Sequence, residues 1–301
     1  MANTLQNISM AEISQKSLET LVNALPALSV FSTDFSADIA NAGESVTTHL
    51  AGQPTSAAIT GGYAAAAQDA SLTSRTVNMG TPEGFVIGFN DTEWSKSNIN
   101  LMDRFIKPGI NAVAAGMIAK VLNLVTAANF TNAKTFTAKF DSDALADLGE
   151  QLTTQKVGTE RGAVLKPALY TKLLKDSAVK NASAYNGDGA IKYGKIDQLS
   201  GFSPIIQYNA MPAGLDGFAG GKEGLIIAAR VPATPANFPG EIDTVSDPDS
   251  GLSIQIRKWY SADLGKYFLA MVIMCGAAVG NAAQLCRIVY QDTAPTEEEG
   301  Q

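Results

Sequence analysis

The segment "RFIKPGINAVAAGMIAKVLNLVTAANF", residues 104–130, constrains the fold more than any other part of the chain. Its large apolar residues recur at steps of four, three, four, four and three: Ile106, Ile110, Val113, Met117, Val121 and Leu124. This spacing is typical of a helix with one apolar face. Because a proline is tolerated only near a helix start or at a kink, Pro108 predicts that the regular helix runs over residues 109–128. Such a helix spans about 30 Å and carries no catalytic side chain, so it is predicted to be a structural spine.

Charge and composition exclude several classes of function. The chain has 22 Lys and Arg against 29 Asp and Glu, a formal net charge of −7, which excludes the basic footprint of a sequence-specific DNA-binding protein. Charged residues make up only 17% of the chain, below the roughly 25% usual for soluble domains, so much of the surface is expected to be covered by other molecules. The longest apolar runs, around "FLAMVIMCGAAVG", fall short of the roughly 18 residues of a membrane span, which predicts a soluble chain with no membrane partner.

The two cysteines, Cys275 and Cys286, lie in apolar runs that have the character of strands. No basic, apolar and small-residue signal of a secretory leader precedes Met10. We therefore predict two buried, reduced thiols in a cytoplasmic product rather than a disulfide.

The first third of the chain predicts a helix followed by a hairpin. Ser9 and Glu12 have the spacing of a capping box, and a short amphipathic helix is predicted over residues 10–25. The β-rich segments "ESVTTHLA" and "LTSRTVNM" then flank a centre rich in Gly, Ala, Ser and Thr. Too few large apolar residues lie between Gly52 and Ser71 for this hairpin to bury a core, so it must lie on something else.

The remainder alternates helical and strand patterns. Ser142 or Asp143 is the expected N-cap of a helix with Leu145, Leu148 and Leu152 on one face, followed by a strand and a second helix. Strands are predicted in "LSGFSPIIQYNAMPA", "EGLIIAARVPA", "GLSIQIRKWY", "KYFLAMVIMCGAAVG" and "AQLCRIVYQ". The fourth of these is apolar on both faces and is expected at the centre of a sheet. The sum is an α+β chain with a projecting arm, a projecting hairpin and two compact lobes.

The search for catalytic and ligand-binding patterns predicts none. His49 is the only histidine and has no second His, Cys or paired carboxylate near it, so it is interpreted as a surface or interface histidine. The segments "GDGAIKYG" and "GFAGGKEG", from Gly187 and Gly217, lack the residues of a nucleotide-binding loop and are predicted to be ordinary loops. No catalytic residue, cofactor or metal ion is expected, and the chain is not expected to be an enzyme.

Three acidic segments are interpreted as structural. "DTVSDPDS", Asp243 to Ser250, lacks the glycine and terminal glutamate of a calcium loop and is predicted to be a solvated turn between strands. "DFSAD" and "DSDALAD" are interpreted as turn and helix-cap acids.

The order of these pieces resembles a known family. "SADIANAGESVT", the spine helix, "VLKPALYTKLLKD" followed by "GKIDQLSGFSPIIQYNAMPA", and "IQIRKWYSADLGKYFLAMVIMCGAAVGNAAQLCRIV" succeed one another as in tailed-bacteriophage major capsid proteins with the Hong Kong 97-type capsid fold. The resemblance implies a peripheral P-domain with a long spine helix and an antiparallel sheet, and an axial A-domain with a mixed sheet and helices. It implies these ranges: 1–35 N-terminal arm, 36–89 extended hairpin (E-loop), 90–138 P-domain spine helix, 139–250 A-domain, 251–292 closing strands of both domains, and 293–301 flexible acidic tail.

The resemblance also implies a function. Pentamers and hexamers of the chain would form an icosahedral head around double-stranded DNA, contacted non-specifically, and the shell would assemble in the host cytoplasm and become part of the virion. A separate scaffolding protein and a portal are the other implied partners. Some members crosslink through a lysine on the E-loop; residues 43–85 contain no lysine, so no crosslink from this loop is expected.

Contacts between copies are the sites that the sequence predicts. Glu44 and Arg75 on the hairpin are candidates for ion pairs between subunits, each worth about 0 to 1 kcal/mol, and His49 is a third contact candidate. Two alternatives stay open. One is an encapsulin-like nanocompartment shell, and the other, more distant, is a small-molecule enzyme with an unrecognised site, which would need a deep polar pocket.

Overall fold

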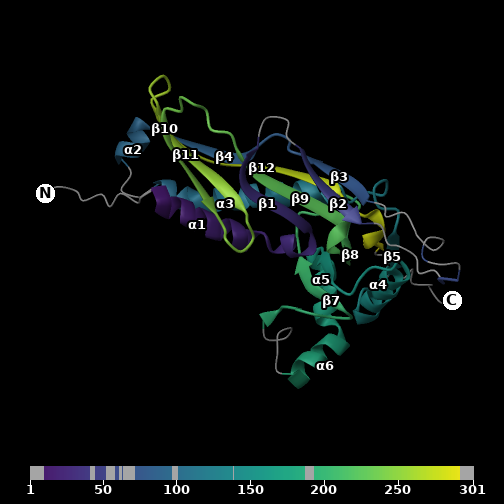
Figure 1. Cartoon of the computed structure of the whole chain (residues 1–301). Helices are drawn as coiled ribbons and strands as arrows, with labels where there is room; N and C mark the ends of the chain where they lie inside the picture. Colours follow the sequence, from purple (N-terminus) through teal and green to yellow (C-terminus); the bar gives the residue numbers. More distant parts are fainter. Residues whose placement is uncertain are drawn as a thin grey trace.

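The computed structural model describes residues 10–40, 45–51, 58–60, 63, 72–96, 101–137, 139–186 and 193–291 (Figure 1). Two mixed sheets and their helices make up most of the described part, and a two-stranded hairpin forms a separate small sheet that packs on the larger one. Within these ranges, no helix combines the length and apolar character needed to cross a bilayer.

A six-stranded sheet forms the larger lobe. Its strands are β1 (Ser32–Ala40), β9 (Leu225–Pro232), β12 (Lys266–Val279), β11 (Ser253–Ser261) and β10 (Gly240–Ser246), with β4 (Glu83–Asn90) also paired to β12. The long strand β12 pairs antiparallel with β11, β4 and β9, whereas β1 joins β9 in parallel. The prediction that the strand apolar on both faces is central is therefore confirmed.

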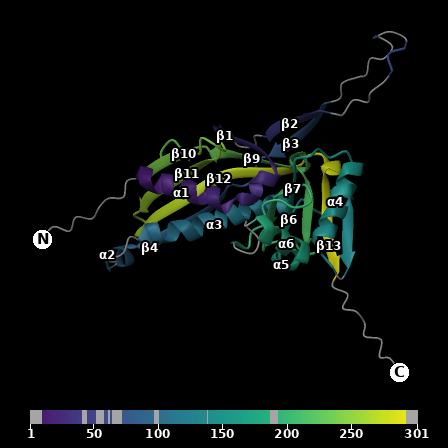
Figure 2. The same ribbon diagram turned by 90° about the horizontal axis from the view of Figure 1, so that it is seen from below.

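Two helices cover one face of this sheet. The helix α1 (Met10–Ala24) packs beside α3 (Leu101–Leu122), and both contact strands of the sheet, as Figure 2 shows from below. Four residues of the predicted apolar face are fully buried there, namely Ile110, Val113, Met117 and Val121. The short helix α2 (Asp91–Lys96) and the 3₁₀ turns η1 (Pro26–Val30), η2 (Lys222–Gly224) and η3 (Ala282–Gln284) complete the connections.

The limits of the spine helix differ from the prediction of 109–128. The helix begins at Leu101, with Pro108 inside it and exposed, and it ends at Leu122. At its end the backbone tightens, since the N–H groups of Leu124 and Val125 bond to carbonyls three residues back. The Asn129 side chain then donates to the Leu124 carbonyl at 2.8 Å, which satisfies one of the helix-end acceptors and turns the chain away.

A five-stranded mixed sheet forms the smaller lobe. Its order is β5 (Ala133–Thr137), β13 (Leu285–Gln291), β8 (Gly217–Gly221), β6 (Arg161–Leu165) and β7 (Phe202–Gln207). The same lobe contains three helices, α4 (Ser142–Thr154), α5 (Pro167–Lys175) and α6 (Ser177–Asn186). Leu145, Leu148 and Leu152 of α4 are buried against this sheet, as predicted. The N-cap of α4 is Asp141 rather than Ser142 or Asp143, because the Asp141 carboxylate accepts from the Ala144 N–H at 3.2 Å.

Three segments predicted to be loops or turns are strands. "GFAGGKEG" supplies β8, which fits between β6 and β13 because it is built from glycine: a Cβ at Gly220 would lie 2.2 Å from the Gln284 carbonyl oxygen. "DFSAD" lies in β1, where pairing with β9 overrides its turn-forming residues. The first half of "DTVSDPDS" belongs to β10, and the turn begins at Asp247. Residues 187–192 of "GDGAIKYG", Ser9 of the proposed capping box, and residues 293–301 lie outside the described ranges.

The two lobes share one core. Val164, Phe218 and Leu285 of the smaller sheet belong to the same apolar cluster as α1, α3 and the larger sheet. Phe31, just before β1, stacks on Phe218 with ring centroids 6.1 Å apart. Of the predicted closing strands in residues 251–292, β11 and β12 lie in the larger sheet and β13 in the smaller one, while β9 and β10 of residues 139–250 also lie in the larger sheet. The domain ranges themselves stay a prediction.

Candidate assembly surface

The feature that most needs a partner is the hairpin of β2 (Ser45–Ala51) and β3 (Leu72–Asn78). The strands pair antiparallel from Ser45 opposite Asn78 to Ala51 opposite Leu72, which confirms the predicted hairpin. Its base packs on the larger sheet through Val77 and Met79. Beyond the base, Figure 2 shows β2 and β3 reaching past the end of that sheet. An isolated two-stranded ribbon is marginal in water, so this hairpin is suited to lie on another molecule.

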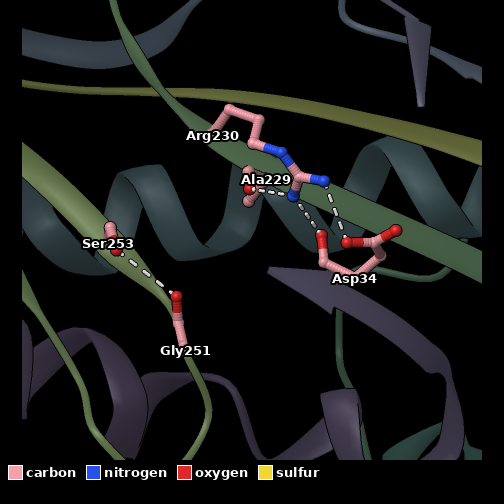
Figure 3. A network of polar contacts seen from close by, with 5 residues as sticks. All are labelled: Asp34, Ala229, Arg230, Gly251 and Ser253. Atoms are coloured by element: carbon pink, nitrogen blue, oxygen red, sulfur yellow. Dashed lines mark hydrogen bonds and ion pairs between the residues drawn. The ribbon is translucent and has the colours of Figure 1, made fainter. Parts of the chain in front are cut away.

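A buried arginine fixes the chain where it approaches the hairpin. The Arg230 guanidinium on β9 donates to the Asp34 carbonyl at 2.9 Å and forms an ion pair with the Asp34 carboxylate, also at 2.9 Å (Figure 3). It donates in addition to its neighbouring carbonyl, that of Ala229. The arginine side chain is only 13% exposed. Two elements that are distant in the sequence are therefore locked together next to the register shift between Phe35 and Ile39.

A lysine fixes the chain where it leaves the hairpin. Lys120 of the spine helix forms an ion pair with Glu83 at 3.0 Å, at the start of β4. The same ammonium donates to the carbonyls of Thr81 and Cys275, each at 3.2 Å. The three contacts join α3, the segment after the hairpin and β12. The strands that precede and follow the hairpin, β1 and β4, are thus each held by a cation with several acceptors.

The sheet face opposite α1 and α3, here called the outer face, carries a group of half-buried aromatic residues. Trp259 of β11 stacks on Phe268 of β12 with centroids 5.1 Å apart, and Phe238 meets the same indole edge-on at 5.5 Å. On the same side Val86 of β4, opposite Ala270, is 60% exposed. Exposed apolar patches of this kind commonly mark interaction surfaces.

The residues predicted as contacts between subunits have different outcomes. Arg75 lies in β3, exposed and opposite Thr48. His49 lies in β2 opposite Ser74. Glu44 lies outside the described residues. The structure therefore places His49 and Arg75 on neighbouring strands of one hairpin, and their contact with another subunit stays a prediction.

Sequence reasoning missed the four charged residues that anchor the hairpin: Asp34, Glu83, Lys120 and Arg230. The sequence does contain a signal for two of these residues, Lys120 and Arg230. Lys120 interrupts "GMIAKVLNL" and Arg230 interrupts "LIIAARVPA", and a single cation in an apolar run must find acceptors if its segment is buried. The acceptors themselves lie 37 and 196 residues away, counted as 120 − 83 and 230 − 34, and no local pattern identifies them.

The two cysteine thiols are held in an unreactive form. Cys275 and Cys286 are free and buried, which confirms the predicted thiols. Burial raises the pKa of each thiol from 9.0 to about 11, so each stays protonated at neutral pH. No group of three or more His, Cys, Asp or Glu residues that could hold a metal ion occurs in the described part of the chain.

Several known structures match this fold over most of their length, although their sequence identity to the chain is low. No family model and no curated protein matches the chain. The capsid of cyanophage P-SCSP1u matches with a TM-score of 0.57 at 13% identity, covering 88% of this chain and 87% of that one. The capsid of Ralstonia phage GP4 matches with a TM-score of 0.56 at 11% identity, covering 88% of each chain.

A third match is a virus-like particle from Pyrococcus furiosus, with a TM-score of 0.53 at 10% identity. It covers 92% of this chain and 98% of that one. At such identities the likeness concerns the fold, and it extends over nearly the whole of each chain. The chain therefore has the tailed-bacteriophage major capsid protein fold, which the sequence resemblance predicted.

Proposed function

We propose that this chain is the major capsid protein of a tailed bacteriophage, whose pentamers and hexamers form an icosahedral shell around double-stranded DNA. The observation that carries the proposal is the fold, shared with phage capsids over 88% of this chain. The larger sheet with α1 and α3 corresponds in this proposal to the P-domain, the smaller lobe to the A-domain, and the β2–β3 hairpin to the E-loop.

Two exposed features support assembly into a shell. The described hairpin is a two-stranded sheet with a packed base, and the outer face carries the exposed Val86 beside the half-buried Trp259 and Phe268. Identical subunits bury such features by binding one another around closed symmetry axes. The shell function thus explains why a chain with few charges exposes both features.

The partners follow from the same proposal. Because the chain has a net charge of −7, packaged DNA would be contacted only weakly and without sequence preference. A scaffolding protein and a portal would be separate chains, assembly would take place in the host cytoplasm, and the product would be the virion. The protein's role is structural rather than enzymatic.

A second candidate is the shell of a nanocompartment that encloses protein rather than a genome. The match to the virus-like particle, which covers 98% of that chain, favours it. The two candidates share the fold and differ in what the shell contains.

The test is electron microscopy with size-exclusion mass measurement on the purified chain, alone and co-expressed with its neighbouring genes. Closed isometric shells, or rings of five or six subunits, are expected. A compact monomer under every condition would overturn the proposal. In shells isolated from producing cells, nuclease-protected DNA supports the phage capsid, whereas a protein cargo without DNA supports the compartment.

A further inference from the structure

Charge is segregated among the helices of the smaller lobe. The exposed acids of α4, Asp143, Asp147 and Glu150, are spaced four and three residues apart and so form one stripe, and α4 contains no lysine or arginine. The helices α5 and α6 contain three lysines, Lys172, Lys175 and Lys180, and no acid. Asp176, which joins α5 to α6, is half-buried and its carboxylate accepts from the N–H groups of Ser142 and Ala178. The exposed charges of each helix group are therefore of one sign.

The acidic stripe borders a hollow. An open cavity of about 400 Å³ lies between α4 and β5, the edge strand of the smaller sheet. Lys134 reaches across it to Asp147 at 3.1 Å, and Glu150, which also lines it, forms no ion pair with a described residue. One lysine against two carboxylates leaves the hollow with a net charge of −1.

The hollow also contains an acceptor without a donor. Gln155 lines it, and its side-chain oxygen is buried and accepts no hydrogen bond from any described residue. A buried acceptor left unpaired costs about 1 to 3 kcal/mol, so a turn of this amide toward a donor in the hollow would be favourable. The cavity thus fits the end of a cationic side chain from outside.

The basic helices lead away from the hollow, although the Asp176 carboxylate between α5 and α6 accepts a hydrogen bond from the Ser142 N–H at the start of α4, at 2.9 Å. The connection β6–α5–α6–β7 leads to β7, the opposite edge of the sheet from β5, and Figures 1 and 2 both show α6 away from α4. The lysine Lys166 is paired to Asp216 at 2.7 Å and Lys195 to Asp197 at 2.6 Å. Lys175 and Lys180 are exposed and form no ion pair with a described residue.

We propose that the α4–β5 flank of one copy binds the α5–α6 flank of the next copy, with Lys175 or Lys180 directed into the hollow toward Glu150 and Gln155. The contact joins two different surfaces, and such heterologous contacts generate rings when the rotation closes. This inference rests on the proposed shell function and specifies which surfaces of the smaller lobe meet around the ring axis. Complementary charge also fixes the direction of the ring, since like flanks repel.

The test is a charge exchange in the full chain. The acid-flank variant carries Asp143→Lys with Glu150→Lys, the base-flank variant carries Lys175→Glu with Lys180→Glu, and the exchange variant carries all four. Each two-residue variant is expected to reduce the assembled fraction roughly tenfold at low salt, because like charges then meet at every ring contact. The exchange variant is expected to recover assembly, since the two flanks are again complementary.

The control has the same charge change at a distance from the flanks. Asp249→Lys with Asp263→Lys alters two exposed turns of the larger lobe and is expected to assemble like the wild type. Circular dichroism and the melting temperature test whether every variant is folded. All are expected to be folded, because substitutions at surface positions usually change stability little.

Each outcome decides the inference. Recovery in the exchange variant, after loss in both two-residue variants, supports it. Assembly of the flank variants at the wild-type level, or folded exchange chains that fail to assemble, overturns this inference alone. A wild-type chain that never assembles overturns the proposed function and this inference with it.

Discussion

Arg230 illustrates how single residues position the hairpin. Its guanidinium donates to two backbone carbonyls, those of Asp34 and Ala229, and to the Asp34 carboxylate. Because two of these acceptors are backbone atoms, most of the anchor does not depend on the charge of Asp34. The planar fork of arginine reaches all three, whereas lysine offers a single ammonium.

Substituting the two partners separates these contributions. Arg230→Met leaves carbonyls without their donor in a largely buried position and is expected to lower the free energy of unfolding by about 1 to 3 kcal/mol. Asp34→Asn keeps the carbonyl contact and removes only the charge of a carboxylate that is 40% exposed, for an expected loss of about 0 to 1 kcal/mol. Urea denaturation measures both. Equal losses in the two variants would show that the ion pair is the main contribution.

The thiol of Cys275 predicts a pH dependence. Its pKa is 9.0 in the unfolded chain and about 11 in the folded one, chiefly because of burial. Between these values the unfolded chain has released a proton that the folded chain still holds, so stability is fully present below pH 9 and falls as the pH rises toward 11.

Comparison with Cys275→Ala isolates this effect from the titration of lysines and tyrosines. From pH 8.5 to pH 11 the wild type is expected to lose up to about 2.7 kcal/mol more than the variant, the value of two pKa units. Chemical denaturation at a series of pH values measures the difference. Parallel pH profiles for the two chains would refute it.

At the scale of elements, the spine helix carries the larger lobe's core. Met117 is fully buried in the C-terminal half of α3, between two turns that also bury Val113 and Val121. Met117→Ala is expected to cost about 2 to 5 kcal/mol, because it leaves a cavity that a packed core refills only in part. The matched control is Asn111→Ala on the exposed side of the same helix, expected to stay within about 0.5 kcal/mol. Similar melting temperatures for both variants would contradict the assigned face.

Periodic elements were predictable and element limits were not. The faces of α3 and α4 and the pairing of the hairpin follow from spacings within the elements themselves. The start of α3 before Pro108 and the strand β8 depend on neighbours instead. The segment Gly217 to Gly221 has no strand pattern in its sequence. Glycine is required there because β6 and β13 approach closely, which the sequence of the segment does not show.

The anchors of the hairpin were unpredictable for a related reason. Asp34 and Arg230 meet only because β1 joins β9 in parallel, a pairing between segments almost 200 residues apart. The exposed position of Arg75 follows from strand alternation, but its partner on another copy does not follow from one sequence.

At the scale of the whole molecule, the hairpin is separable from the fold. Its base contributes Val77 and Met79 to a small cluster on the sheet, and neither belongs to the two main cores. We therefore expect the part of the hairpin beyond this base to add little to the stability of one subunit and to contact another. If the shell function is correct, it should be needed for assembly and dispensable for folding.

A shortened hairpin tests this separation. Residues 50–73 are replaced by Asn-Gly, so that His49 and Ser74, which already pair, are joined by a two-residue turn of the type that closes hairpins. The melting temperature is expected to stay within a few degrees of the wild type, because about 1 kcal/mol corresponds to roughly 2 °C or less in a domain of this size. Shells or rings seen by electron microscopy are expected to disappear. Because folding and assembly are read separately, a stable variant that still forms shells would show that the outer hairpin is not an assembly element, and an unfolded variant would show that it belongs to the subunit's own core.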